Sequence, residues 1–196
     1  SAFGSVERTA EFLRAVAEEQ GVELAEQFAA GIAFLSRFDE QAARARMNEL
    51  AGIAAALRAG STLPGVEILK RNSARIVARA GDSAIKIFLE RPANAAREAR
   101  SLARARTLGV PVPELLGSGA DWNATRFLSD ARPATRSDLA AILAATADAH
   151  DRGLLHGDLH LGNLLVDRGR IVFLDLQRAR FLPWVPAALR RWELGY

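Results

Sequence analysis

Cysteine is absent from the 196-residue sequence, and its absence excludes disulfide bonds, zinc sites built from thiolates and a cysteine nucleophile. The sequence also lacks any uninterrupted apolar run that approaches the roughly 20 residues of a membrane-spanning helix. A basic segment followed by an apolar core is missing from the first residues, so we predict no signal peptide. These absences fit a reducing compartment, and we expect a cytoplasmic protein.

Lysine is scarce, whereas arginine is abundant: of 26 basic residues, only Lys70 and Lys86 are lysines. The charge is unevenly placed. Residues 1–63 carry six arginines and nine acidic residues, whereas residues 64–196 carry twenty basic and fourteen acidic residues. The basic part favours an anionic partner, such as a nucleotide, a phosphorylated sugar or a membrane surface. The alternative is that arginine is common throughout the sequence and marks no partner.

Aromatic residues are few, at 7% of the sequence, and the arginines are spread over the predicted helices and strands. Nucleic-acid binding by stacking and phosphate contacts needs both kinds of residue on one surface, so we expect no nucleic acid as a partner. Hydrophobic residues make up 49% of the sequence, which is enough for a sizeable core.

Residues 5–59 have the apolar spacing of two or three amphipathic helices. Gly21 and residues 37–39 are predicted breaks, and the last helix is expected over residues 40–59. Residues 60–65 then predict a linker. We therefore predict that residues 1–63 form a helical segment of unknown role, either a support for the rest of the fold or a separate regulatory or dimerising element.

The remaining sequence predicts an α+β fold in two parts. Residues 64–130 are expected to form a small antiparallel sheet with a helix, and residues 131–196 a helix, a loop and a hairpin. The second helix is expected over residues 138–152 with Ser137 as its cap. The predicted strands cover residues 66–70, 75–79, 84–89, 114–117, 125–128, 164–166 and 171–174, and the first helix covers residues 93–108.

One loop carries the strongest functional pattern. Its sequence, His156-Gly157-Asp158-Leu159-His160-Leu161-Gly162-Asn163, fits the H-x-D-x-x-x-x-N pattern of kinase catalytic loops. Phosphoryl transfer needs a carboxylate beside the attacking hydroxyl and an oxygen ligand for Mg²⁺ on the phosphate side. We therefore predict Asp158 as the catalytic base, Asn163 as a metal ligand, and His156 as the residue that anchors the loop.

Three further residues occur in the order that kinase chemistry requires. Asp175 ends an apolar run twelve residues after Asn163, where kinases place a second metal-binding aspartate. Lys86 lies within an apolar strand and corresponds to the lysine that binds the α- and β-phosphates. Glu98 in the next helix is its expected partner, with Glu90 as a weaker alternative. The set predicts that Lys86, Glu98, Asn163 and Asp175 bind ATP and Mg²⁺.

The sequence also departs from an ordinary protein kinase. The predicted turn at residues 71–74 contains no glycine, so the glycine-rich phosphate loop is missing. Gly157 replaces the arginine that usually binds a phosphorylated activation loop, and we expect no such switch. Asp175-Leu176-Gln177 replaces D-F-G, and no A-P-E sequence follows.

Two sequence runs resemble the lipopolysaccharide core kinases, which phosphorylate Kdo and heptose. Residues 156–163 match H-G-D-L-H-x-G-N, and residues 175–181 match D-L-[HQ]-R-x-R-F. The resemblance extends from about Glu67 to Phe181. It implies a reduced two-lobed protein-kinase-like fold that phosphorylates a sugar hydroxyl, with a lipid-linked sugar as one candidate acceptor. It also implies the roles given above for Lys86, Glu98, Asp158, Asn163 and Asp175.

Two other functions stay open. Aminoglycoside and choline-type small-molecule kinases share the loop, although they usually continue with I-D-[FW], which is absent here. A pseudokinase or nucleotide-binding regulator would bind nucleotide through Lys86 without turnover. The missing glycine loop favours the regulator, whereas the intact residues Asp158, Asn163 and Asp175 argue for an enzyme.

The C-terminal residues predict a patch that docks on an anionic membrane surface, because tryptophan prefers the headgroup layer and arginine is attracted to anionic lipid. The alternative is that Pro183 and Pro186 introduce a supporting helix and that both tryptophans are buried. The patch would consist of Phe181, Leu182, Trp184, Val185, Leu189 and Trp192, interleaved with Arg178, Arg180, Arg190 and Arg191.

Overall fold

The computed structural model describes residues 24–194. The chain divides into two units, Ser1–Glu49 and Leu50–Tyr196. The helix expected before residue 24 and the break at Gly21 lie outside the described residues. Within the described residues, no helix is both long enough and apolar enough to span a bilayer.

A single helix, α2 (Leu24–Arg58), stands where the sequence predicted two helices with a break at residues 37–39. The prediction of a break was wrong, because residues 37–39 contain neither proline nor glycine and can all adopt helical dihedral angles. The chain leaves the helix at Gly60, whose φ of 87° side chains strongly disfavour. The last turns of α2 bury Leu50 and Leu57 in the core beneath the sheet.

Five antiparallel strands form the main sheet, in the order β1-β2-β3-β5-β4. The alternation of its side chains places Ile76 of β2 and Ile85 and Ile87 of β3 in the same core as the end of α2, at most 2% exposed. The strands are β1 (Val66–Arg71), β2 (Arg75–Ala80), β3 (Ser83–Phe88), β4 (Leu115–Ser118) and β5 (Trp122–Arg126).

Strand β5 begins at Trp122, three residues before the predicted start at residue 125. Its first residues pair with β3, with Trp122 opposite Ile87 and Asn123 opposite Lys86. Pairing with a strand more than thirty residues away decides this boundary, and a local sequence pattern contains no information about it.

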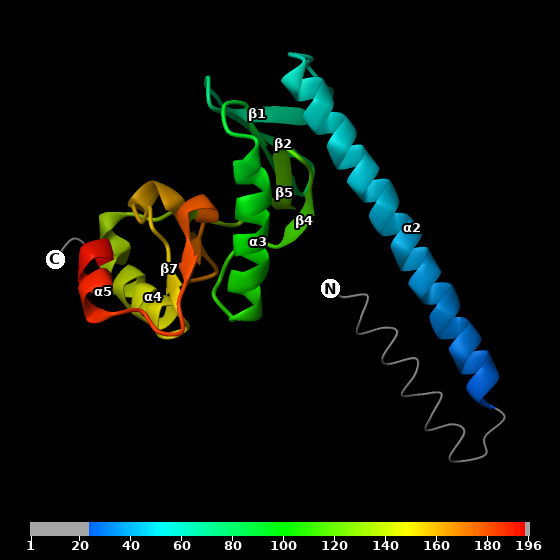
Figure 1. Ribbon diagram of the computed structural model, residues 1–196. Helices are drawn as coiled ribbons and strands as arrows, with labels where there is room; N and C mark the ends of the chain where they lie inside the picture. The colour runs from blue at the N-terminus through cyan, green and yellow to red at the C-terminus, as the bar shows by residue number, and fades with distance from the viewer. Residues whose placement is uncertain (1–23, 195–196) are drawn as a thin grey trace. The chain divides into compact units, whose positions relative to one another are not determined.

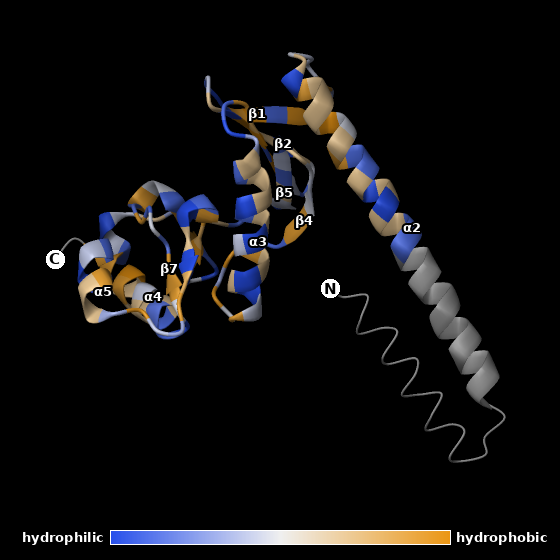
Figure 2. Ribbon diagram, viewed as in Figure 1, coloured by the Kyte–Doolittle hydropathy of each residue, from blue (hydrophilic) through white to orange (hydrophobic). Residues whose placement is uncertain are grey.

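Helix α3 (Ala93–Thr107) packs along the sheet (Figure 1). Ala95, Ala99 and Ala105 are buried and its arginines are exposed, so hydrophilic and hydrophobic turns alternate along it in Figure 2. Glu98 is an exception, since it is a charged residue of this helix that is 3% exposed. A buried carboxylate is costly unless it is paired, so its position requires a cationic partner.

The second half of the fold packs helix α4 (Leu139–Asp151) against a hairpin. Phe173, Leu164 and Leu154 form its core together with Ile142 of α4. The other elements are the strands β6 (Arg132–Pro133), β7 (Leu154–Leu155), β8 (Leu164–Asp167), β9 (Arg170–Phe173) and β10 (Arg180–Phe181), the 3₁₀ turns η1 (Arg136–Asp138), η2 (Leu161–Asn163) and η3 (Leu176–Arg178), and helix α5 (Ala187–Leu194).

The start of α4 differs from the predicted cap at Ser137. The η1 turn precedes the helix, and Asp138 accepts a hydrogen bond from the backbone N–H of Thr135 at 2.9 Å. Ser137 lies inside this turn, so the chain enters the helical conformation earlier than its side chain would suggest. The combination of a small antiparallel sheet with helices confirms the predicted α+β fold class.

Candidate active site

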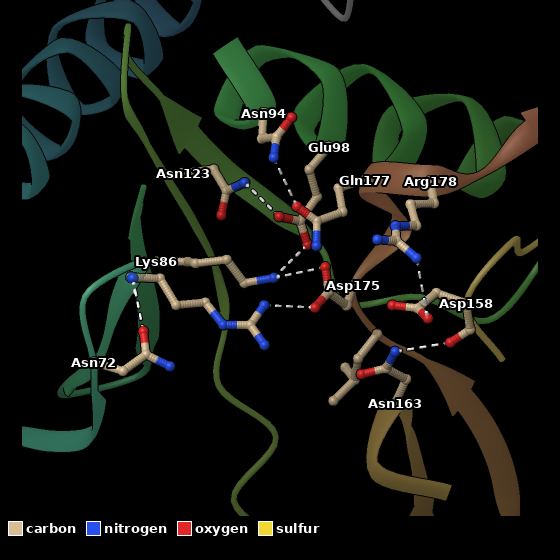
Figure 3. Close-up of polar contacts among 12 residues, drawn as sticks. Asn72, Lys86, Asn94, Glu98, Asn123, Asp158, Asn163, Asp175, Gln177 and Arg178 are labelled. Carbon is tan, nitrogen blue, oxygen red and sulfur yellow. Dashed lines mark hydrogen bonds and ion pairs between the residues drawn. The ribbon is translucent and has the colours of Figure 1, made fainter. Parts of the chain in front are cut away.

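Lys86 and Glu98 form the ion pair that the sequence predicted. Lys86 Nζ lies 2.7 Å from Glu98 Oε1, and both side chains are largely buried. Asn123 of β5 donates a hydrogen bond to the other carboxylate oxygen at 3.2 Å. Figure 3 shows the three side chains meeting between the sheet and α3. The alternative partner Glu90 is therefore wrong, because it lies beyond the end of β3 and Glu98 occupies the position beside Lys86.

Asp175 lies just after strand β9 in the left-handed conformation, with a φ of 58°. Its Oδ2 is 2.7 Å from Nη1 of Arg75, and its Oδ1 is 3.4 Å from Lys86 Nζ. Burial alone would raise the pKa of Asp175, but the charges of Lys86 and Arg75 outweigh it and lower the pKa. The carboxylate is therefore ionised at neutral pH.

The oxygens at the site suit a magnesium ion. Oδ1 of Asp175 is buried and accepts no hydrogen bond from the described residues; its cationic neighbour is the Lys86 ammonium at 3.4 Å, so the oxygen still has lone pairs that a metal ion could share. The side chain of Asn163 donates from Nδ2 to the backbone oxygen of Asp158 at 2.9 Å, which leaves its own oxygen for a ligand. Among the described residues no three His, Cys, Asp or Glu side chains form a metal cage. Such a sparse set fits Mg²⁺, which in nucleotide sites takes its other ligands from phosphate and water.

His156 anchors the loop through two hydrogen bonds of its buried ring. Its Nε2 donates a hydrogen bond to the backbone oxygen of Leu174 at 2.8 Å, because a carbonyl oxygen can only accept. Its Nδ1 then accepts the N–H of Asp158 at 3.3 Å. Burial lowers the pKa of His156, so the ring is neutral in the tautomer that these two bonds require. His156 links the loop to the strand end that precedes Asp175.

Gly157 allows the loop to turn. Its φ is 78°, and a Cβ atom here would lie 2.5 Å from the backbone oxygen of Arg178. Only glycine avoids both the strained conformation and this clash. The turn directs the Asp158 carboxylate outward, 36% exposed, with its Oδ1 3.7 Å from Nη1 of Arg178 (Figure 3).

Glu193, which the sequence analysis did not single out, also holds the loop in place. The carboxylate of Glu193, on α5, accepts the backbone N–H of His156 at 3.1 Å and that of Gly157 at 2.5 Å. His150 of α4 contacts the same carboxylate at 2.8 Å. Burial would raise the pKa of Glu193, but these hydrogen bonds outweigh it and lower the pKa. A glutamate 36 residues beyond Gly157 gives no local signal for such a role.

Five of the six predicted site residues line one cavity of about 410 Å³. The sixth, His156, lies beneath the loop and is 2% exposed. The volume is within the range of small-molecule sites. The five residues are Lys86, Glu98, Asp158, Asn163 and Asp175, and Arg75 and Asn123 line the cavity with them.

This arrangement defines a phosphotransferase of the protein-kinase-like superfamily. A lysine–glutamate pair, a carboxylate on a catalytic loop and a second carboxylate one hairpin later face the same cavity. The chain belongs to the phosphotransferase enzyme family, whose model matches residues 4–185. The match begins well before Glu67, so it includes most of the helical segment for which the sequence alone indicated no relative.

Two solved structures support the same fold. A choline/ethanolamine kinase family protein from Mesorhizobium loti aligns with a TM-score of 0.54 and 21% identity, over 76% of this chain and 69% of that one. The macrolide 2′-phosphotransferase MphH from Brachybacterium faecium aligns with a TM-score of 0.50 and 18% identity, over 74% and 81%. WaaP in complex with acyl carrier protein gives a TM-score of 0.49 and 19% identity, over 66% and 68%. No sequence among the curated proteins matches the chain.

Proposed function

We propose that this chain transfers the γ-phosphoryl group of ATP to a sugar hydroxyl, with Asp158 as the catalytic base. The observation that carries the proposal is the position of the Asp158 carboxylate. It is partly exposed at the edge of the cavity that contains Lys86, Glu98 and Asp175. A base must contact an incoming hydroxyl and also lie beside the phosphate to be transferred, and this position meets both needs.

The nucleotide would lie with its phosphates against Lys86, which Glu98 and Asn123 orient. Asn163 and Asp175 would hold Mg²⁺, which neutralises the charge of the triphosphate when bound. Because Glu98 holds Lys86 in place before the nucleotide arrives, less side-chain entropy is lost on binding.

In the transfer, the acceptor oxygen forms a bond to the γ-phosphorus while the bond from that phosphorus to the bridging oxygen breaks, and ADP leaves. The acceptor hydroxyl loses its proton to the Asp158 carboxylate. Asn163 donates a hydrogen bond to the loop backbone, and His156 and Glu193 accept hydrogen bonds from it, so the proposed base is positioned before the substrate binds.

The acceptor is proposed to be a sugar of the lipopolysaccharide core type, or another lipid-linked or small-molecule sugar, met on the cytoplasmic side. The support is the run D-L-Q-R-A-R-F at residues 175–181, which resembles the core kinases. This run extends from Asp175 through η3 to β10, which pairs with β7 just before the catalytic loop.

The test is ATP consumption against phosphosugars, Kdo-lipids, aminoglycosides and protein, in wild type and in Asp158→Asn. We expect a sugar to be phosphorylated, and we expect the variant to lose about 10²–10⁴ in rate while it still binds nucleotide. Asp130→Asn is the matched control, because that aspartate is exposed and lies outside the cavity. Wild-type turnover in Asp158→Asn would remove it as the base. Nucleotide binding without turnover on any acceptor would favour the regulatory alternative.

A further inference from the structure

The turn between β1 and β2 has already used the backbone donors with which a glycine-rich loop would bind phosphate. Asn72 Oδ1 accepts the backbone N–H of Ala74 at 3.1 Å and that of Arg75 at 2.9 Å. The N–H of Asn72 itself donates to the backbone oxygen of Arg75 at 3.0 Å. A glycine-rich loop binds phosphate through N–H groups of this kind. The phosphates of a nucleotide therefore need another donor at this end of the sheet.

The side chain of Arg75 is in the right place to be that donor. In the pairing of β2 with β3, Val77 lies opposite Lys86, and Arg75 lies opposite Phe88. Residues two apart on a strand, and residues opposite each other on paired strands, share one face of a sheet. Arg75 therefore projects from the same face as Lys86, and both line the cavity of about 410 Å³ that contains Asp175.

Two cations flank the Asp175 carboxylate. Nη1 of Arg75 lies 2.7 Å from its Oδ2, and Nζ of Lys86 lies 3.4 Å from its Oδ1 (Figure 3). Lys86 has a second partner in Glu98, whereas within residues 24–194 Asp175 is the one carboxylate that Arg75 contacts. An Asp175 that holds a metal ion shares its negative charge with that ion, and its attraction for Arg75 weakens. The guanidinium then lacks a counter-charge in the cavity, and a phosphate group can supply one.

Arg75 also has room to change its acceptor. Its side chain is 27% exposed, and it lines a second cavity, of about 300 Å³, together with Asn72, Asn94 and Gln177. A side chain that lies between two cavities can adopt another rotamer without displacing packed atoms. The guanidinium can therefore leave Asp175 while strand β2 stays in place.

We propose that Arg75 binds the terminal phosphates of ATP in place of a glycine-rich loop, and that its ion pair with Asp175 is the resting state of this side chain. The inference rests on the proposed function, in which ATP is the phosphoryl donor. When Asp175 holds a metal ion, the guanidinium binds the β- and γ-phosphates through its N–H donors, which suit phosphate oxygens. Arg75 is thus an anion-binding residue with two alternative acceptors, a carboxylate without nucleotide and phosphate with it.

Nucleotides that differ in their terminal phosphates test the inference. Calorimetry at saturating MgCl₂ measures the binding of ATP and of AMP to wild type and to Arg75→Ala. We expect the variant to bind ATP at least about tenfold more weakly and AMP within about twofold, because charge-assisted hydrogen bonds to the terminal phosphates are lost. An ATP affinity equal to that of wild type, or an equal loss for AMP, would overturn the inference.

Arg100→Ala is the matched control. It removes the same side chain at an exposed residue of α3 that lines neither the cavity with Lys86 nor the one with Asn94. Both nucleotides should bind to this variant as they do to wild type. If Arg100→Ala weakens ATP binding as much as Arg75→Ala does, the effect comes from net charge alone and the inference is wrong.

The exchange of acceptors can be tested without a metal ion. In buffer with EDTA, Asp175→Asn removes the carboxylate that holds Arg75 in its resting state, and ATP affinity should rise about fivefold. The same substitution made in Arg75→Ala should give a much smaller gain, because the guanidinium that would be released is absent. An equal gain in both backgrounds would show that only the lost negative charge matters, and Arg75 would then not exchange acceptors.

Turnover separates failure of the inference from failure of the proposed function. If wild type phosphorylates an acceptor but Arg75→Ala binds ATP as wild type does, the inference fails and the proposed function stands. If Arg75→Ala loses affinity for ATP and not for AMP, but wild type phosphorylates no acceptor, Arg75 binds the phosphates and the proposed reaction fails. A wild-type protein that does not bind ATP would refute both.

Discussion

Among single residues, Arg75 makes the closest charged contact with Asp175. Its guanidinium lies 2.7 Å from one oxygen of Asp175, in a strand that follows a turn without glycine. The arginine therefore neutralises the aspartate that we propose as a metal ligand, and a cation that binds to Asp175 must compete with it.

We predict that Arg75→Ala binds Mg²⁺ more tightly in the absence of nucleotide, by about fivefold, corresponding to roughly 1 kcal/mol for a partly exposed ion pair. The pKa of Asp175 should rise in the variant, because a cation that lowered it is gone. Calorimetric titration with MgCl₂ measures the first effect. Arg79→Ala is the control, since Arg79 lies on the same strand and lines neither cavity. Unchanged Mg²⁺ affinity in Arg75→Ala would show that Asp175 does not bind the ion.

Residue types and spacing were enough to predict the cavity that contains Lys86, Glu98, Asp158, Asn163 and Asp175. These residues could be predicted because they follow one another along the chain in the order that kinases use. Arg75 and Glu193 could not be predicted in this way. One arginine of 24 carries no distinguishing pattern, and a glutamate in a C-terminal helix reaches the catalytic loop only through packing.

At the scale of elements, α5 is the support of the catalytic loop. One turn of this helix presents Glu193, whose two oxygens accept three hydrogen bonds from two other elements. Loss of a charged acceptor in a buried position leaves these donors poorly paired. The C-terminal helix is thus hydrogen-bonded to the loop that carries Asp158, the proposed base, although it contributes no lining residue to the cavity that contains Lys86.

We predict that Glu193→Gln lowers kcat at least tenfold with little change in nucleotide affinity, and lowers the free energy of unfolding by about 2 kcal/mol at pH 7. The folded pKa of Glu193 is below its unfolded value, so this stabilisation is fully present above about pH 4 to 5 and is lost as pH falls through the folded pKa. Urea unfolding at pH 7 and at pH 3 measures the difference. A constant difference at both pH values would contradict the role of the charge, and Glu67→Gln on exposed β1 provides a control.

The elements that the sequence mispredicted share a physical cause. The predicted break at residues 37–39 is absent, because no residue there prevents a helix. The strands β6, β7 and β10 have two residues each, too few for an alternating pattern, and they exist because of partners distant in sequence. Long periodic segments such as α3 and β2 were predicted within about one residue at each end.

At the scale of the whole molecule, the segment 1–63 cannot be separated cleanly from the sheet. Leu50, Ala54 and Leu57 are at most 3% exposed and lie in the same core as Ile76 and Ile85. Deleting them would expose the face of the sheet that carries Ile76 and Ile85. The free energy of unfolding would fall by about 2–5 kcal/mol for each leucine. The free energy of unfolding of a typical domain is only about 5–15 kcal/mol in total.

We therefore predict that a chain starting at residue 64 aggregates or lacks a cooperative unfolding transition, whereas a chain starting at residue 46 unfolds cooperatively. Thermal unfolding followed by circular dichroism distinguishes the two. The longer fragment keeps all three buried residues and serves as the control for loss of the preceding helix. A folded, nucleotide-binding chain from residue 64 would show that the end of α2 is dispensable.

A further prediction concerns a membrane surface. Trp184 and Trp192 are 66% and 62% exposed, so the alternative in which both are buried is wrong. Arg190 is not free to bind lipid, because it contacts Asp151 and the backbone oxygen of Val185. The patch that could dock therefore centres on Trp184 and the exposed Arg191.

We predict that the protein sediments with anionic vesicles at low salt and not with neutral ones, and that Trp184→Ala with Arg191→Gln weakens this binding about tenfold. Leu139→Ala with Arg170→Gln removes one exposed apolar side chain and one arginine elsewhere, and should bind as wild type does. If both variants lose binding equally, or wild type does not sediment, the exposed tryptophans have no role at a membrane.

Gly157 has a consequence for the history of this enzyme. Because its backbone turns at a φ of 78° against the carbonyl of Arg178, no single substitution can introduce a larger residue at this position without remodelling the loop. In protein kinases an arginine at this position usually binds a phosphorylated activation loop, so that form of control would need more than one substitution here. A lineage built on this glycine would therefore have to evolve regulation elsewhere, through the supply of its acceptor, the abundance of the protein or contacts made by other surfaces.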